Sequence, residues 1–140
     1  MNATLCRLGL FLLLAMSVSV QADDAAPPLT ASGAWIRTPP PGSPVMAGYV
    51  TLRNDGKREV RFAKVQSASF GAIEIHEMRE LNGLMRMRPV PSIVVQPGDT
   101  VALEPGGLHL MLFRPNVELV EGAKVELDLI LDAGAGTQSI

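Results

Sequence analysis

Turn-forming residues recur at short intervals along this chain, and their spacing restricts the folds that the chain can adopt. Clusters of Pro, Gly, Asn and Asp recur between residues 39 and 122, and the segments between them are short and rich in Val, Ile, Leu and Thr. None of these segments shows the periodicity of about 3.6 residues that marks an amphipathic helix. Many short strands with frequent turns predict an all-β sandwich or barrel. The expected strands are 33–37, 47–53, 60–65, 72–78, 84–88, 92–95, 101–104, 108–113 and 124–131.

The first 22 residues are typical of a secretory signal peptide. A short segment carrying one positive charge precedes an apolar run over 8–20, which is too short to cross a bilayer comfortably. A small-residue cleavage site follows at Ala22. We therefore expect a periplasmic protein with no membrane span in the mature chain. The expected organisation is a signal peptide at 1–22, a flexible lead at 23–32, a β-sandwich domain at 33–132 and a short flexible tail at 133–140.

The composition of the mature chain excludes several classes of function. Cleavage would leave 118 of the 140 residues, enough for one domain with a core. Loss of Arg7 leaves 11 basic and 14 acidic residues with no basic patch, which argues against nucleic-acid binding. No Ser/His/Asp order, phosphate-binding loop or pair of catalytic carboxylates stands out. We expect a monomer that is not an enzyme.

The only two histidines of the chain each lie close to methionines. His76 begins a His-Glu-Met sequence and is followed by Met87, while His109 begins a His-Leu-Met sequence that ends at Met111. The only cysteine, Cys6, leaves with the signal peptide. Imidazole and thioether without thiolate suit Cu(I), whereas Zn(II) favours Cys or carboxylate beside His and a blue-copper centre needs a Cys thiolate. The competing interpretation is ordinary packing, since a lone His or Met on a strand usually has no metal.

The dipeptide Asn82-Gly83 predicts a β-hairpin between two apolar runs, because a type I′ turn needs positive φ at both central residues. A two-residue loop fixes the register of the two strands. His76 then lies diagonal to Met87 on one face, roughly 7–8 Å away and within reach of long side chains. The expected facing pairs are Leu81 with Leu84, Glu80 with Met85, and Met78 with Met87.

Alternation along the strands separates the candidate ligands from the core. His109 and Met111 are two residues apart and share a face, with leucines at 108, 110 and 112 on the other. Ile73 and Ile75 likewise lie on the face of their strand opposite to that of His76. We expect both histidines on an exposed face, so that replacing either leaves the core intact. Glu77 is expected to be a cross-strand partner of Arg88.

With these residues in hand, the chain resembles the periplasmic copper chaperones of the PCuAC family. The family pattern is His, ten residues, Met, twenty-one residues, then His-x-Met, and it is met in full by His76, Met87, His109 and Met111. The resemblance runs from about residue 34 to 131. Supporting segments begin at Ala34-Trp35, Met46-Ala47, Met85-Arg86 and Leu103-Glu104.

The resemblance implies a cupredoxin-like β-sandwich of Greek-key type that binds one Cu(I) per chain at an exposed site. It also implies a metallochaperone that carries copper toward the copper centre of cytochrome c oxidase by ligand exchange. The implied acceptors are cytochrome c oxidase subunit II and Sco-type proteins. Many members carry a His/Met-rich tail for Cu(II), which the sequence ending at Ile140 does not show. Met78 and Met85 are extra thioethers that could act as transient ligands.

Two other functions remain open from the residues alone. A copper-resistance or storage protein would use the same site for a different destination. A metal-free β-sandwich interaction module would use its methionine patch to bind protein. Metal titration separates the second alternative from the copper carrier, and oxidase activity in a deletion strain separates the first.

Overall fold

A computed structural model describes residues 28–132 and 136–140 of the chain, and every regular element in these ranges is a β-strand. The expected signal peptide at 1–22, the lead residues 23–27 and the tail residues 133–135 lie outside the described residues. The strands are β1 (Leu29–Arg37), β2 (Val45–Asn54), β3 (Val60–Gln66), β4 (Phe70–Leu81), β5 (Leu84–Pro89), β6 (Ile93–Val95), β7 (Thr100–Leu103), β8 (Leu108–Pro115), β9 (Asp128–Leu131) and β10 (Thr137–Ser139).

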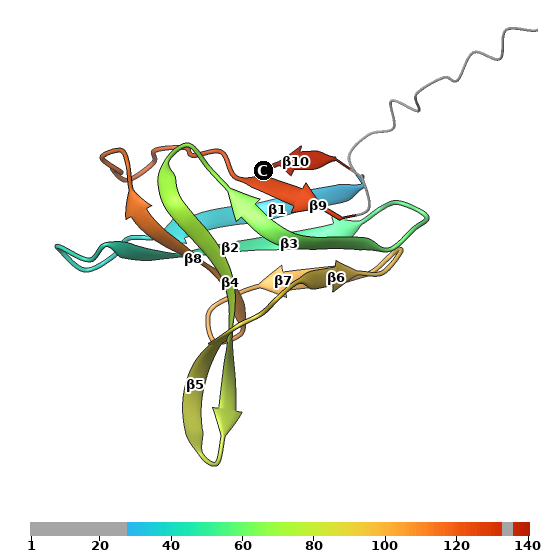
Figure 1. Ribbon diagram of the computed structural model, residues 1–140, viewed down its shortest axis with the longest axis horizontal. Helices are drawn as coiled ribbons and strands as arrows, with labels where there is room; N and C mark the ends of the chain where they lie inside the picture. The colour runs from blue at the N-terminus through green and yellow to red at the C-terminus, as the bar shows by residue number, and fades with distance from the viewer. Residues whose placement is uncertain (1–27, 133–135) are drawn as a thin grey trace, which may run out of the picture.

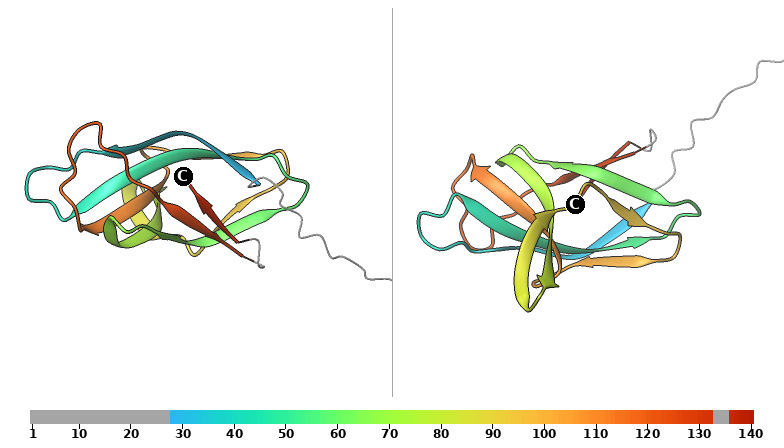
Figure 2. Two further views of the ribbon diagram at one scale, coloured as in Figure 1. Left: turned by 90° about the horizontal axis from the view of Figure 1, so that it is seen from above. Right: turned by 60° about the horizontal axis from the view of Figure 1, so that its bottom comes forward.

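The strands form two sheets packed face to face (Figures 1 and 2). The larger sheet has the order β1-β2-β8-β4-β5, with β7 paired to β2, and the smaller sheet has the order β10-β9-β3-β6. Both sheets contribute fully buried side chains to one core between them, which confirms the predicted all-β sandwich. The largest of these apolar side chains are Leu52, Leu110 and Leu112 from the larger sheet and Phe62, Val95 and Leu129 from the smaller one.

Two described segments within the expected lead and tail are β-strands in the structure. Strand β1 begins at Leu29, whose side chain is buried and whose backbone N–H donates to Oε1 of Gln138 at 3.1 Å. The side-chain amide of Gln138 donates back to the carbonyl of Leu29. Residues 29–32 pair with β2 and residues 137–139 pair with β9, so these described parts of the expected lead and tail are strands.

The last expected strand, 124–131, is also shorter in the structure. It begins at Asp128, where its ladder with β3 starts opposite Gln66. The residue before it, Leu127, instead exchanges two backbone hydrogen bonds with Ile140. The other eight expected strands are present, with ends that differ by a few residues.

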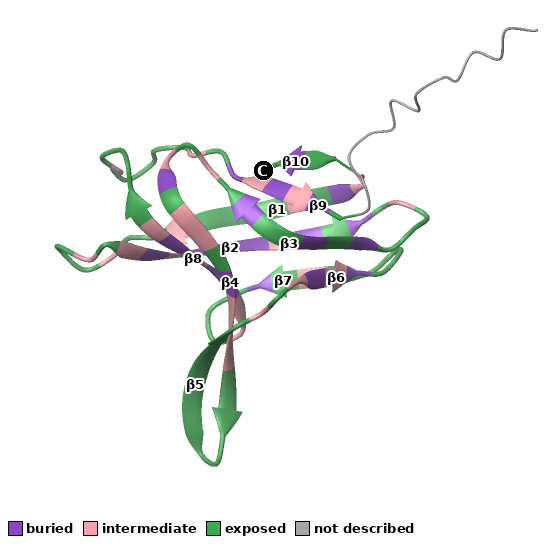
Figure 3. Ribbon diagram, viewed as in Figure 1, coloured by how far each residue is buried: buried purple, intermediate pink, exposed green. Residues whose placement is uncertain are grey.

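A hairpin of β4 and β5 projects from the body of the sandwich (Figures 1 and 3). Strand β4 has 12 residues; its inner part pairs with β8 and its outer part with β5. The turn residues Asn82 and Gly83 have φ values of 54° and 78°, as a type I′ turn requires. The register is the predicted one, with Leu81 opposite Leu84, Glu80 opposite Met85 and Met78 opposite Met87.

Within the part of the chain that the structure describes, no helix is long and apolar enough to cross a membrane.

Candidate metal centre

The four predicted ligands come from three adjacent strands of the larger sheet. His76 on β4 pairs directly with His109 on β8, and Met111 on β8 pairs with Glu74 on β4. Met87 on β5 pairs with Met78, two residues beyond His76. Directly paired residues share a face, and so do residues two apart on one strand. All four candidates therefore lie on the outer face of the larger sheet, the face turned away from the smaller sheet.

The opposite face of the same strands points into the core. Ile75, Leu110 and Leu112 are buried there, and Ile73 and Leu108 pack against them. This separation of candidate ligands from core residues is the one that the alternation predicted. It means that the site is built on the outside of a sheet whose inner face is fixed by packing.

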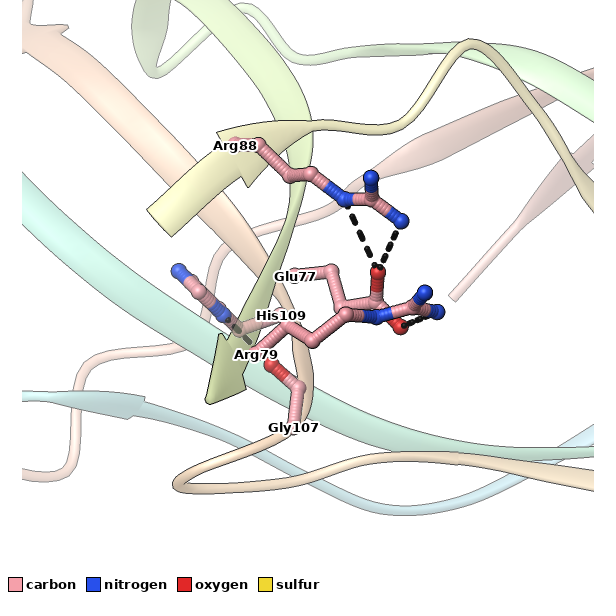
Figure 4. A network of polar contacts seen from close by, with 5 residues as sticks. All are labelled: Glu77, Arg79, Arg88, Gly107 and His109. Atoms are coloured by element: carbon pink, nitrogen blue, oxygen red, sulfur yellow. Dashed lines mark hydrogen bonds and ion pairs between the residues drawn. The ribbon is translucent and has the colours of Figure 1, made fainter. Parts of the chain in front are cut away.

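His109 is the most buried of the four candidates, with 4% of its surface exposed. Its strand β8 lies between β2 and β4, so the ring is flanked by neighbouring strands on both sides. Its Nδ1 lies 3.0 Å from the carbonyl oxygen of Gly107 (Figure 4). A carbonyl only accepts, so Nδ1 carries the proton and Nε2 keeps its lone pair. The prediction that His109 is exposed is wrong, because strand order, not strand pattern, sets its burial.

His76 faces His109 across the β4–β8 pair. The ring centres are 6.1 Å apart and the ring planes are tilted by 58°. A metal ion held by two imidazole nitrogens at about 2 Å each puts ring centres roughly 5–6 Å apart, which is close to the separation seen here. The side chain of His76 is 14% exposed, and its Nε2 lies 2.9 Å from Oε2 of Glu74.

The other ring nitrogen of His76, Nδ1, is buried and has no hydrogen-bond partner. Among the described residues it is the one buried side-chain nitrogen or oxygen in this condition. Buried polar groups are nearly always paired, and an unpaired one calls for an explanation such as a bound ion. An unpaired imidazole nitrogen beside a second imidazole fits a metal ligand.

The two candidate thioethers differ in exposure. Met111 is half-buried in the body of the sheet, beside Ala47 of β2. Met87 lies on the projecting hairpin and is 49% exposed. Two further thioethers share this outer face, because Met78 pairs with Met87 and Met85 lies two residues before Met87. His76, His109 and Met111 thus lie in the body of the sheet, and Met87 lies beside them on the exposed hairpin.

The donor set of this site is soft. The described residues contain no group of three or more His, Cys, Asp and Glu side chains placed to hold a metal ion, which is the arrangement that Zn(II) or a hard cation would use. Two imidazoles and thioethers remain, and this set matches Cu(I). The residues present therefore fit a soft metal ion such as copper.

Charged residues occupy the opposite face of the hairpin. Glu77 accepts hydrogen bonds from Arg79 at 3.2 Å and from Arg88 at 3.1 and 3.3 Å (Figure 4), which confirms the predicted pair with Arg88. These two guanidinium groups, Arg79 first, lower the pKa of Glu77 below its ordinary value. The network ties β4 to β5 beside the site without entering it.

Sequence reasoning missed three features of the outer face. The first is Glu74, whose position two residues before His76 on one strand was a sufficient signal. The second is the carbonyl of Gly107, which depends on how the turn before β8 closes. The third is a stack of Trp35 on Tyr49, with ring centres 4.5 Å apart and the guanidinium of Arg37 within 5.9 Å of both rings.

Comparison with known proteins defines the family. A family model described as "Putative lipoprotein LpqE-like" matches residues 29–139, so the chain belongs to the LpqE-like family. A curated relative from Leifsonia xyli, "Putative lipoprotein Lxx21020", is 28% identical over 105 residues, which cover 74% of this chain and 62% of that protein. The chain spans 48–62% of the length of the curated relatives that it matches.

Solved structures define the fold. The "Copper-bound PCuAC domain from PmoF2" is 23% identical with a TM-score of 0.66 and covers 83% of this chain, while 91% of that domain is covered. The "Apo PCuAC domain from PmoF1" is 24% identical with a TM-score of 0.65, covering 81% of this chain and 89% of that one. At this identity the likeness establishes the fold, which is a cupredoxin-like β-sandwich.

Proposed function

We propose that this protein is an exported Cu(I) carrier that holds one copper ion with His76, Met87, His109 and Met111. The observation that carries the proposal is the facing pair of His76 and His109, with an unpaired buried nitrogen, beside thioethers on the same outer face. The copper-bound state of a domain with this fold supports the same chemistry. The proposed role is transport and not catalysis.

The unequal exposure of the four residues suggests how copper is released. Met87 is half exposed on a projecting hairpin, so an incoming ligand from an acceptor can displace its thioether first. His109 is buried in the body of the sheet and leaves last. Neutral thioethers need no proton to be released, so exchange proceeds without a change in protonation at sulfur. Met85, 54% exposed and nearer the hairpin tip, is placed to contact the ion during exchange.

We propose that the destination is the copper centre of cytochrome c oxidase, with subunit II of the oxidase and Sco-type thiol proteins as acceptors. Thiolate ligands of such acceptors bind Cu(I) more strongly than thioethers because they are anionic, so transfer toward them is downhill. Export to the periplasm by the leader at 1–22 fits this destination. Amino-terminal sequencing of the protein recovered from the periplasm tests the leader directly.

The experiment for the proposal is a competition titration of the mature protein with a Cu(I) chelator, in parallel with Zn(II). We expect one Cu(I) per chain and a strong preference over Zn(II). A stoichiometry near zero, or equal affinity for Zn(II), would exclude a copper carrier and favour a metal-free interaction module. The exposed Leu81, Leu84 and Met85 of the hairpin are the feature that supports such a module.

A storage or copper-resistance protein would pass the same titration. Deletion of the coding sequence separates the two functions. Loss of oxidase activity that added copper restores is the result expected for a carrier to the oxidase. Copper sensitivity with normal oxidase activity is the result expected for storage or resistance.

A further inference from the structure

Glu74 is an acidic residue that engages one of the two ring nitrogens of His76. It lies two residues before His76 on β4, so both side chains project from the outer face. Its Oε2 is 2.9 Å from Nε2 of His76. A carboxylate only accepts, so the proton of the neutral ring is on Nε2. The lone pair is then on Nδ1, the ring nitrogen that Glu74 does not contact.

That Nδ1 is the buried nitrogen without a partner. Burying a hydrogen-bond acceptor away from water without a donor costs free energy, so such groups are rare unless they bind a ligand. Because Glu74 engages Nε2, the nitrogen left without a hydrogen-bond partner is the buried Nδ1.

His109 has the opposite arrangement. Its Nδ1 donates to the carbonyl of Gly107 at 3.0 Å, which leaves Nε2 as the free nitrogen. The two facing rings, 6.1 Å apart, are therefore held as different tautomers by different partners. Glu74 acts on His76 as the carbonyl of Gly107 acts on His109.

We propose that Glu74 is a positioning residue that holds His76 as the Nε2–H tautomer, so that His76 binds Cu(I) through Nδ1 while His109 binds through Nε2. The proposal rests on the copper-carrier function argued above. A carboxylate on the far nitrogen of a metal-binding His fixes the ring and makes the ligand nitrogen more basic, and its loss typically costs 10–100-fold in metal affinity. The side chain of Glu74 is 56% exposed, so it can be replaced without opening the core.

The first experiment measures the tautomers in the metal-free protein by long-range ¹H–¹⁵N correlation at mildly alkaline pH. We expect His76 to carry its proton on Nε2 and His109 on Nδ1. Adding Cu(I) should then shift the Nδ1 resonance of His76 and the Nε2 resonance of His109. An Nδ1–H tautomer at His76, or a copper-induced shift at its Nε2, would overturn the proposal.

The second experiment measures Cu(I) affinity in two Glu74 variants and a matched control. Glu74→Ala should weaken binding about tenfold or more and leave His76 a mixture of tautomers. Glu74→Gln keeps an acceptor oxygen and should retain much of the affinity and the Nε2–H tautomer. Glu80→Ala removes the same charge from the same face of β4, at the hairpin position opposite Met85, and should change neither.

Unchanged affinity in Glu74→Ala would overturn the role of Glu74, as would an equal loss in Glu80→Ala, which would mark a general charge effect. An oxygen ligand that appears in the X-ray absorption spectrum of the wild-type protein and vanishes in Glu74→Ala would make Glu74 a direct ligand and would also overturn the proposal. Absence of copper binding by the wild-type protein would instead overturn the proposed function, and the tautomers of the metal-free protein distinguish the two failures.

Discussion

Strand β4 passes through two different environments, and the difference between them organises the site. Its inner half contributes the buried Phe70 and Ile75 to the core and pairs with β8 in the body of the sandwich. Its outer half, beyond His76, forms a hairpin with β5, whose six residues are all exposed. The imidazoles lie where the body ends, and the thioether of Met87 lies on the hairpin. Three candidate ligands in the packed body and one on an exposed hairpin suit a carrier, because holding and release then depend on different parts of the molecule.

Replacing His109, which lies in the body of the sandwich, should have the largest effect on Cu(I) binding. We expect His109→Ala to weaken Cu(I) binding by at least 100-fold, about 2.7 kcal/mol or more. Because the ring is 4% exposed and bonded to Gly107, we also expect a loss of roughly 1–3 kcal/mol in the free energy of unfolding. Chelator competition and thermal unfolding measure the two losses, and unchanged stability would contradict the burial of this ring.

Replacing Met87 should affect the hairpin side alone. Met87→Leu keeps an apolar side chain of similar size but removes the sulfur, so Cu(I) affinity should fall by at least tenfold, about 1.4 kcal/mol. Unfolding should change by less than about 0.5 kcal/mol, because the side chain is half exposed. Met78→Leu is the matched control on the paired position and should change affinity little while slowing transfer to an acceptor. If Met78→Leu is the variant that loses copper, the register is right and the ligand assignment is wrong.

Two glycine substitutions, one in the hairpin and one in the body, should lower stability by similar amounts but differ in their effect on Cu(I) binding. Gly83 in the hairpin turn and Gly98 in the body have φ values of 78° and 80°, and a Cβ added at either meets no atom within 4 Å. Each change to Ala should therefore cost roughly 1 kcal/mol through backbone strain alone. We expect only Gly83→Ala to weaken Cu(I) binding, by a few-fold, because it loosens the hairpin register. Equal effects on binding would show that the hairpin turn does not position Met87.

The smallest effect concerns the ion pairs on the far face of the hairpin. The lowered pKa of Glu77 means that its pairs with Arg79 and Arg88 stabilise the protein at neutral pH and lose that contribution as the pH falls through the pKa of the folded state. Arg79→Gln should raise the pKa of Glu77 toward its ordinary value, and Arg88→Gln should raise it less. Carboxyl ¹³C chemical shifts followed during an acid titration measure both. A pKa of Glu77 that neither substitution moves would contradict the network.

Local patterns in the sequence were sufficient to predict the hairpin and the face of the strand on which each candidate ligand lies. Asn82-Gly83 determines a turn type and with it the register that places Met87 near His76. Alternation alone assigns His109 and Met111 to the face opposite the core leucines. Both inferences use residues that are close in the chain, where geometry leaves few choices.

Features that depend on distant pairings could not be obtained in this way. The burial of His109 follows from the position of β8 between β2 and β4, which no local pattern specifies. The hydrogen bonds between Leu29 and Gln138 join residues that are 109 positions apart in the chain. The contact between Glu74 and His76 could be predicted from their spacing on one strand. The proposed role of Glu74 could not, because it depends on the unpaired Nδ1 of His76, which is visible only in the folded protein.

The central claim is that the body supplies two imidazole nitrogens and the sulfur of Met111, and the hairpin supplies the sulfur of Met87, to one copper ion. X-ray absorption on the Cu(I)-loaded protein, measured for the wild type and for Met87→Leu, tests it most directly. We expect two nitrogen and two sulfur ligands in the wild type, with one sulfur lost in Met87→Leu. A wild-type spectrum without sulfur, or a sulfur count that Met87→Leu leaves unchanged, would contradict the claim.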